Sequence, residues 1–461
     1  MTQNHKLTRR EALRAVAGGF LCSMARGAPA FHLATFSTDV TPPLGEPLIG
    51  GLFQPALKIV DPLYAKGFVL LGADKPMVLV AVDFCEIRNL DTQHWHTALA
   101  EAAGTDPNRV LVTSGHQHNA PLADTLAEKI IEEYGIKGKV CDPAYHEQCI
   151  RRTVEAVRQA IRKSTRVTHF GFSRAKVDRV ASNRRVVLPD GTVNYHRMSA
   201  ARDPAIRDAP EDLIDPYLKT LSFWDGRRPL AVLSCYSVHP QTHFGKGDVT
   251  SDFTGLARLK RQEETPDVFQ ILTRGCSGDT VTGKYNDGDP KNIPVLAERL
   301  RAGMADAWKD VQKEPLTSVS WRYAPLHLKM NEEDNLSEAA EKRTLSDKSQ
   351  RYLELFRAAS GLSWRRWAAE GHGIDIPAVD FGAVKLVLAP AEAFVQYQLW
   401  AQEMRPDSFV MVMGYGECAP GYIPTKKAVA EGWKDHAWEW ADPPSSEDAM
   451  LPALHEALRK A

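Results

Sequence analysis

Strand-length hydrophobic runs alternate with longer amphipathic segments along most of this chain. The runs are rich in Val, Ile and Leu, and they cover 67–71, 77–83, 110–113, 230–235 and 268–272. Runs of this length and composition are typical of buried β-strands. Helical periodicity covers 91–103, 144–163, 294–311 and 336–359. The pattern predicts a mixed α/β (α+β) fold, in which buried mixed sheets are flanked by helices.

Two further patterns refine this prediction. Asp190-Gly191 stands between two short stretches with strand character and favours a β-hairpin. The stretch 329–367 is polar, charged and helical in pattern, so we expect a solvent-facing pair of helices there, with a boundary or an insertion as the alternative. The sequence contains no recognisable internal repeat and no long linker. Residues 31–461 are therefore predicted to form one domain.

The N-terminal segment has the features of an export signal. Arg9 and Arg10 precede a small, mildly apolar run over 15–24, and Ala28-Pro29-Ala30 ends the segment. This order predicts a twin-arginine-type signal peptide over residues 1–30 and a periplasmic or secreted protein. The alternative is a short amphipathic helix with two surface arginines. Removal of the segment would change the net charge from −1 to −5, because it carries five basic residues and one acidic residue.

Composition excludes several classes of protein. The chain has 461 residues, of which 43% are hydrophobic and 25% charged, as in a globular protein with a large core. Lys and Arg total 57 against 58 Asp and Glu, so nucleic-acid binding through a basic surface is not expected. No apolar run is long enough to predict a transmembrane helix. The cysteines are too scattered for a disulfide scaffold, and nothing here indicates an oligomeric state.

Metal-binding residue types follow several of the predicted strands. His116 and His118 come after the run 110–113, His239 follows 230–235, and Glu392 follows a run over 384–388. Strand ends of an α/β sheet meet at one edge, so these side chains can converge there. Two histidines and a carboxylate are a common ligand set for catalytic zinc. Each residue alone also has a structural interpretation, such as a helix cap for Glu392.

An ordered series of motifs resembles the catalytic N-terminal domain of the neutral/alkaline (non-lysosomal) ceramidase superfamily. The motifs lie at 39–45, 113–121, 182–185, 190–193, 238–240, 251–253, 275–279, 390–392 and 421–425. They spread over residues 32–440, which is nearly the whole chain after the predicted signal. The resemblance implies the ceramidase catalytic-domain fold, a metal site at strand ends, and a small-molecule or lipid substrate.

The resemblance also implies a set of site residues. The implied zinc ligands are His116, His239, Glu392 and Tyr422. The implied catalytic residues are His118, which would shuttle a proton or bind the developing oxyanion, and Arg184, which would orient the substrate. Two aspartates, Asp252 and Asp279, are candidates for supporting the histidines or for turn and helix-cap roles.

This sequence departs from the family pattern in ways that bear on its chemistry. Val281 stands where family ceramidases have a serine proposed as nucleophile, and whether Thr280 or Thr282 replaces it is left open. Ala391 replaces a glycine before the implied ligand Glu392. The chain also ends at Ala461, so no C-terminal immunoglobulin-like domain is expected.

The resulting hypothesis is an exported, zinc-dependent hydrolase that cleaves an amide (N-acyl) bond with metal-activated water. Its substrate would be ceramide-like. One alternative is hydrolysis of an ester or a glycoside in a polar exported substrate. A second alternative, from a different class, is a non-catalytic extracellular binding protein that has kept the fold.

Overall fold

The computed structural model describes residues 30–333, 335–433 and 438–460. The predicted signal peptide lies outside these residues, apart from Ala30. Within the described part of the chain, no helix is both long enough and apolar enough to cross a membrane. The six cysteines in this part are buried and form no disulfide.

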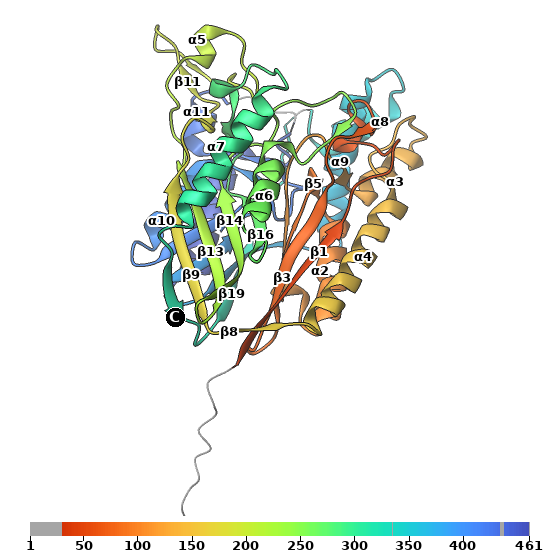
Figure 1. The fold of residues 1–461 in the computed structure, drawn as a ribbon. Helices are drawn as coiled ribbons and strands as arrows, with labels where there is room; N and C mark the ends of the chain where they lie inside the picture. Colours follow the sequence, from red (N-terminus) through yellow and green to blue (C-terminus); the bar gives the residue numbers. More distant parts are fainter. Residues whose placement is uncertain (1–29, 334, 434–437, 461) are drawn as a thin grey trace, which may run out of the picture.

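The first sheet is built from the N-terminal third of the chain, in the order β6-β4-β3-β1-β8. Its strands are β1 (Phe31–Asp39), β3 (Tyr64–Leu71), β4 (Met77–Val82), β6 (Val110–Ser114) and β8 (Thr165–Val167). β1, β3 and β4 are antiparallel neighbours, whereas β4 and β6 are parallel. Helices α2 (Leu90–Ala103) and α4 (Pro143–Ile161) pack on the outer face of this sheet (Figure 1).

The second sheet has the order β16-β14-β13-β9-β18. Its strands are β9 (His169–Lys176), β13 (Tyr217–Asp225), β14 (Arg228–Tyr236), β16 (Phe269–Arg274) and β18 (Gln312–Pro315). β9, β13 and β14 are antiparallel neighbours, and β14 and β16 are parallel. Helices α6 (Asp252–Glu264) and α7 (Asn292–Ala307) cover its outer face, in front of the sheet in Figure 1.

The third sheet has the order β19-β20-β21-β23. Its strands are β19 (Ser320–Leu326), β20 (Ile374–Asp380), β21 (Val384–Leu388) and β23 (Phe409–Met413). β19, β20 and β21 are antiparallel neighbours, and β21 and β23 are parallel. Helices α10 (Val395–Met404) and α12 (Pro443–Leu458) pack on the outside.

The three sheets therefore repeat one unit, which the sequence does not reveal. Each unit begins with three antiparallel strands, followed by a crossover helix (α2, α6 or α10) and a fourth strand that is parallel to the third. A later helix (α4, α7 or α12) then packs over the first strand of the unit. The inner faces of the sheets meet in one core, where the Phe223 ring contacts Phe68 at 5.1 Å and Phe381 at 6.0 Å between centroids. The carboxyl ends of the parallel strands supply the loops of the candidate site.

Local sequence explains where the helices begin. Asp142 and Asp442 precede α4 and α12, and each accepts a backbone N–H bond within the first helical turn. A proline at the first helical position follows each aspartate, where the missing N–H has no intrahelical partner to lose.

Short strand pairs connect the loops that leave the three sheets. They are β5 (Glu86–Ile87) with β7 (Leu122–Ala123), β22 (Glu392–Ala393) with β24 (Tyr422–Ile423), β10 (Ser182–Asn183) with β17 (Thr280–Val281), β2 (Lys58–Ile59) with β15 (Asp248–Val249), and β11 (Val186–Val187) with β12 (Val193–Asn194). The last pair is the predicted hairpin, with Gly191 at a φ of 84°. The remaining helices are α3 (Thr125–Glu133), α5 (Pro204–Arg207), α8 (Glu338–Ser346), α9 (Tyr352–Ala369) and α11 (Lys426–Ala430).

The helical pair predicted within 329–367 is present as α8 and α9, but the prediction that it faces solvent is wrong for α9. Phe356 and Trp364 of α9 are 1% and 3% exposed, and the helix packs against α3. Alanine, glycine and serine alternate with the large residues in this helix, which lowers its overall hydrophobicity. The polar composition of 329–367 therefore did not indicate that α9 is buried.

Candidate metal centre and active site

The loops after three parallel strand pairs bring His116, His239 and Glu392 together. The Nε2 atoms of the two histidines are 2.9 Å apart. Glu392 Oε2 lies 3.1 Å from His116 Nε2 and 3.5 Å from His239 Nε2. All three side chains are buried. The sequence prediction that these residues share one site at the strand ends matches their placement.

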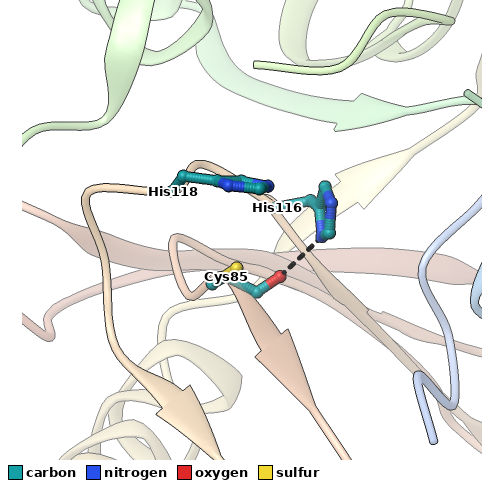
Figure 2. Close-up of side chains that lie close together, drawn as sticks. All are labelled: Cys85, His116 and His118. Carbon is teal, nitrogen blue, oxygen red and sulfur yellow. Dashed lines mark hydrogen bonds between the residues drawn. The ribbon is translucent and has the colours of Figure 1, made fainter. Parts of the chain in front are cut away.

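Hydrogen bonds fix the tautomers of both imidazoles. His116 Nδ1 lies 3.1 Å from the Cys85 carbonyl oxygen, and Figure 2 shows this bond; His239 Nδ1 lies 3.2 Å from the Ser277 carbonyl oxygen. A carbonyl only accepts, so each Nδ1 carries a hydrogen, and in a neutral imidazole of this tautomer Nε2 presents a lone pair. Burial holds the pKa of His239 well below its ordinary range, which keeps this imidazole neutral.

The three acceptors therefore point at one another without a donor between them. Glu392 Oε2 is buried and has no hydrogen-bond donor among the described residues. Lone pairs from two imidazoles and a carboxylate that converge within hydrogen-bond distance require a cation or a proton at their centre. Two histidines and one carboxylate are also the ligand set of many catalytic zinc sites. The donor set fits a divalent metal ion.

Backbone strain accompanies this arrangement. His116, Ala391 and Tyr415 have φ values of 56°, 50° and 58°, in the left-handed region that non-glycine residues rarely adopt. Such a conformation costs about 1–3 kcal/mol per residue and persists where the surrounding structure enforces it. The Tyr415 ring stacks on His116 at 4.4 Å, and its hydroxyl lies 2.8 Å from Ser277 Oγ. These turns thus orient the proposed ligand residues towards one another, and they do so in backbone conformations of higher energy.

Tyr422 and Arg184 lie beside the cluster. Strand β22 pairs with β24 in a register that places Glu392 directly opposite Tyr422. The Tyr422 ring is stacked with His239 at 6.5 Å between centroids. Arg184 Nη2 donates a hydrogen bond to the Tyr422 hydroxyl at 2.8 Å, and the guanidinium lies 5.2 Å from the ring centroid. The two residues that the family resemblance added are therefore at the site.

His118 has a defined tautomer as well. The Ser199 hydroxyl donates to Gln241 Oε1 at 2.7 Å, which orients the amide so that its Nε2 donates to His118 Nδ1 at 2.9 Å. His118 Nε2 then carries the hydrogen, and it is a buried donor with no partner in the described structure. Burial, together with the neighbouring His116 and Arg184, holds the pKa of His118 well below its ordinary value. His118 is therefore a neutral hydrogen-bond donor.

The two aspartates contact loops of the site. Asp279 accepts from Asn183 Nδ2 and from the backbone N–H of Val395, both at 2.8 Å. Asp252 accepts from the backbone N–H and the hydroxyl of Thr242, at 2.9 and 2.6 Å. The Nδ1 atoms of His116 and His239 are instead bonded to backbone carbonyls. The aspartates tie together the segments that carry Arg184, His239 and Glu392.

A second group of metal-ligating atoms overlaps the first. Ligand atoms of Cys85, His116 and His118 lie within 4.8 Å of one another (Figure 2). A cysteine binds metal as a thiolate, but burial raises the pKa of the Cys85 thiol well above its ordinary value. This group therefore fits a metal ion less well than His116, His239 and Glu392.

A cavity of about 320 Å³ opens onto the cluster. Its apolar lining includes Ile49, Leu52, Phe53, Phe244, Phe356 and Trp438. Its charged lining consists of Glu86, Arg88, Arg184, Arg357 and Glu392. Among the described residues, neither Thr280 nor Thr282 lines this cavity, and the Thr282 hydroxyl is bonded to the Ser199 carbonyl at 2.8 Å. An apolar wall with a few charged groups is suited to an amphiphilic ligand.

Sequence reasoning missed most of the residues that line the cavity, and four of the missed residues contact or adjoin the proposed site residues. Glu86, Arg88, Gln241 and Tyr415 either line the cavity or contact the proposed ligands. Gln241 is close in sequence to His239, and Tyr415 is close to the 421–425 motif. This nearness to a motif was the sequence feature that could have indicated both residues. Glu86 and Arg88 follow the run 77–83 at a strand end, the same position that singled out the histidines, and were overlooked because no family motif covers them.

Comparison with known proteins finds relatives by structure alone. No protein-family model matches the sequence, and no curated protein matches it. A solved structure of a ceramidase complexed with C2 is similar with a TM-score of 0.68 and 16% sequence identity, over 93% of this chain and 75% of that chain. The neutral ceramidase from Pseudomonas aeruginosa is similar with a TM-score of 0.67 and 16% identity, over 93% and 74% of the two chains.

These likenesses define the class of fold. The chain has the fold of the neutral ceramidase catalytic domain, as the motif series predicted. The match extends over nearly all of the chain, including the three repeated units that carry His116, His239 and Glu392.

Proposed function

We propose that this protein is an exported, metal-dependent hydrolase that cleaves the amide bond of an N-acyl compound, with zinc as its ion. The observation that carries the proposal is the convergence of three unpaired acceptors, from His116, His239 and Glu392, at the end of a partly apolar cavity. The ceramidase fold supports an amide as the bond and an acyl chain as part of the substrate.

The metal would be held by His116, His239 and Glu392, with Tyr422 opposite Glu392 as the further ligand that the family resemblance implies. A bound zinc ion polarises a carbonyl group as a Lewis acid and lowers the pKa of bound water to about 7. The backbone bonds from both Nδ1 atoms hold the imidazole rings in the tautomer that presents Nε2.

His118 and Arg184 would act on the substrate. A neutral imidazole whose Nε2 carries the hydrogen can donate a bond to the oxygen that becomes negative during amide hydrolysis. This supports oxyanion binding over proton shuttling as the role of His118. Arg184 is held by Tyr422, so its guanidinium is oriented before the substrate arrives.

The lost serine supports direct attack by water. Val281 is fully buried in β17 and has no nucleophilic group. Neither neighbouring threonine is among the described residues that line the cavity. A mechanism without a covalent acyl-enzyme therefore accounts best for the groups that the cavity presents.

Metal analysis and a matched substrate panel test the proposal. Purified protein should contain about one zinc per chain, and hydrolysis of fluorogenic N-acyl substrates should stop with chelator and return with zinc. His116→Ala should lose both the metal and the activity. His94→Ala, on the outer surface of α2, is the matched control and should change neither. A protein that binds no zinc, or that cleaves esters or glycosides and no amide, would contradict the proposal.

A further inference from the structure

A buried ion pair forms part of the wall of the catalytic cavity. Arg88 Nε donates to Glu86 Oε2 at 2.5 Å, and Arg88 Nη2 contacts the same oxygen. Arg88 is 2% exposed and Glu86 is 5% exposed, yet both line the cavity. Removing two charges from water carries a large desolvation penalty that their attraction must offset, so such a pair is weak evidence for stability. A ligand that binds to this ion pair would explain why two charged residues lie in the wall of the cavity.

One end of the Arg88 guanidinium has no partner. Its Nη1 is buried and makes no hydrogen bond within the described structure. The guanidinium lies 4.9 Å from the ring centroid of Trp440 and 5.9 Å from that of Phe356. These rings and Glu86 hold the planar group in one orientation. Arg88 therefore presents a fixed, unused N–H donor in a buried position.

The charges of the cavity favour an anion. Three guanidiniums, those of Arg88, Arg184 and Arg357, face two carboxylates, those of Glu86 and Glu392. The proposed metal ion would add two further positive charges beside Glu392. A divalent ion beside a buried guanidinium in a low-dielectric cavity would attract and stabilise a negative ligand group.

Glu86 connects the Arg88 guanidinium to the reacting centre. Glu86 Oε1 lies 3.7 Å from His116 Nδ1, while Glu86 Oε2 is bonded to Arg88. One carboxylate thus spans the distance between Arg88 and a proposed metal ligand. A group bound by Arg88 belongs to a part of the substrate only a few atoms from the bond that is cleaved.

We propose that the substrate is an N-acyl amphiphile with a carboxylate next to the scissile amide, as in an N-acyl amino acid, and that Arg88 binds this carboxylate through Nη1. This inference rests on the proposed amidase function. The apolar wall receives the acyl chain, and the Glu86–Arg88 pair selects the anionic end. The neutral head group of a ceramide offers the Arg88 donor only hydroxyl oxygens, which accept a weaker hydrogen bond than a carboxylate does.

Two matched ligand pairs test the proposal. Dodecyloxyacetate and 2-(dodecyloxy)ethanol are uncleavable and differ in a carboxylate against a hydroxyl group; their binding to zinc-loaded protein is measured by calorimetry. The carboxylate should bind about ten- to a hundredfold more tightly, as a charge-assisted hydrogen bond to a buried guanidinium allows. N-dodecanoylglycine and N-dodecanoylethanolamine form the cleavable pair, for which kcat/KM should favour the glycine conjugate similarly.

Variants assign the preference to Arg88. Arg88→Met with Glu86→Gln removes both charges, so neither is left buried alone, and it should equalise each ligand pair. The control is Arg258→Met with Asp83→Asn, which removes another buried ion pair that does not line this cavity and should preserve the preference. A preference that survives in the Arg88 variant, as direct binding of the carboxylate to the metal would produce, overturns the proposal.

The outcomes separate this inference from the proposed function. If neither dodecanoyl amide is cleaved but the uncleavable carboxylate still binds through Arg88, the amidase proposal fails and the recognition of an anionic amphiphile stands. If both amides are cleaved equally well, or the ethanolamide is preferred, the amidase proposal stands and the inference about Arg88 is wrong.

Discussion

Glu392→Gln should stabilise the metal-free protein and reduce the stabilisation that zinc provides. In the metal-free protein the Glu392 carboxylate faces the lone pairs of His116 and His239 and has no donor among the described residues. A glutamine amide in the same place has N–H groups that can donate to either Nε2. The substitution therefore supplies the missing hydrogen bond, while it removes an anionic metal ligand.

The size of the effect follows from the buried acceptor. An unsatisfied buried polar group costs about 1–3 kcal/mol. Unfolding entropy near 60 °C is about 2.1 cal/mol/K per residue, which gives about 1 kcal/mol/K for 461 residues. Metal-free Glu392→Gln should therefore melt about 1–3 °C above the wild type. Zinc at a hundred times its Kd should stabilise the wild type by about 2.7 kcal/mol, or about 3 °C, and the variant by less.

Differential scanning calorimetry in chelator and in buffered zinc measures both effects on the same samples. The variant should melt above the wild type in chelator, and the wild type should gain more from zinc, so the difference between the two melting temperatures should become smaller in zinc. A variant that melts below the wild type in chelator would refute the idea that three acceptors face one another. If zinc raises the melting temperatures of the wild type and the variant equally, Glu392 is not a metal ligand.

Three further predictions concern residues around the site. Asp279→Ala leaves two donors of the site segments unpaired, Asn183 Nδ2 and the backbone N–H of Val395. It should therefore lower the free energy of unfolding by about 2–4 kcal/mol in urea titrations. It should also reduce kcat without changing the zinc content. Ala391→Gly should raise stability by about 1 kcal/mol in the same titrations, because it relieves the left-handed φ of 50°; a loss would show that Ala391 is unstrained. Burial raises the pKa of Glu417 from 4.5 to about 8, so its contribution to stability is present at pH 4.5 and is lost as pH rises towards 8. Glu417→Gln should therefore flatten the pH profile of stability between pH 4.5 and about 8 and remove a loss of up to about 5 kcal/mol; parallel profiles would contradict the raised pKa.

The sequence predicted those parts of the fold that depend on local pattern. β4, β6, β14 and β16 are buried on both faces, so they appear as continuous apolar runs, and α2 appears through its helical period. The threefold repetition of the unit could not be predicted, because it lies in strand order and not in shared residues. Similar backbones can be specified by many apolar sequences once volume and pattern are kept.

The convergence of His116, His239 and Glu392 was predictable because these residues follow strand ends, where chain topology limits what can converge. The positions of Glu86 and Arg88 also follow a strand end, but charged residues there are usually solvated, and their burial depends on α9 and on the Trp440 ring far along the chain. Gln241 orients His118 through a hydrogen bond that only the tertiary structure creates. Such contacts leave no periodic signal.

His116, His239 and Glu392 belong to three different copies of the repeated unit, so an ion bound by them would act as a cross-link among the three. His116 and His239 alone are 123 residues apart in sequence. Closing so long a loop removes conformational entropy that rises with the logarithm of its length. Loss of the ion should therefore first increase the rates of hydrogen exchange and proteolysis at the boundaries between sheets, while each sheet stays folded.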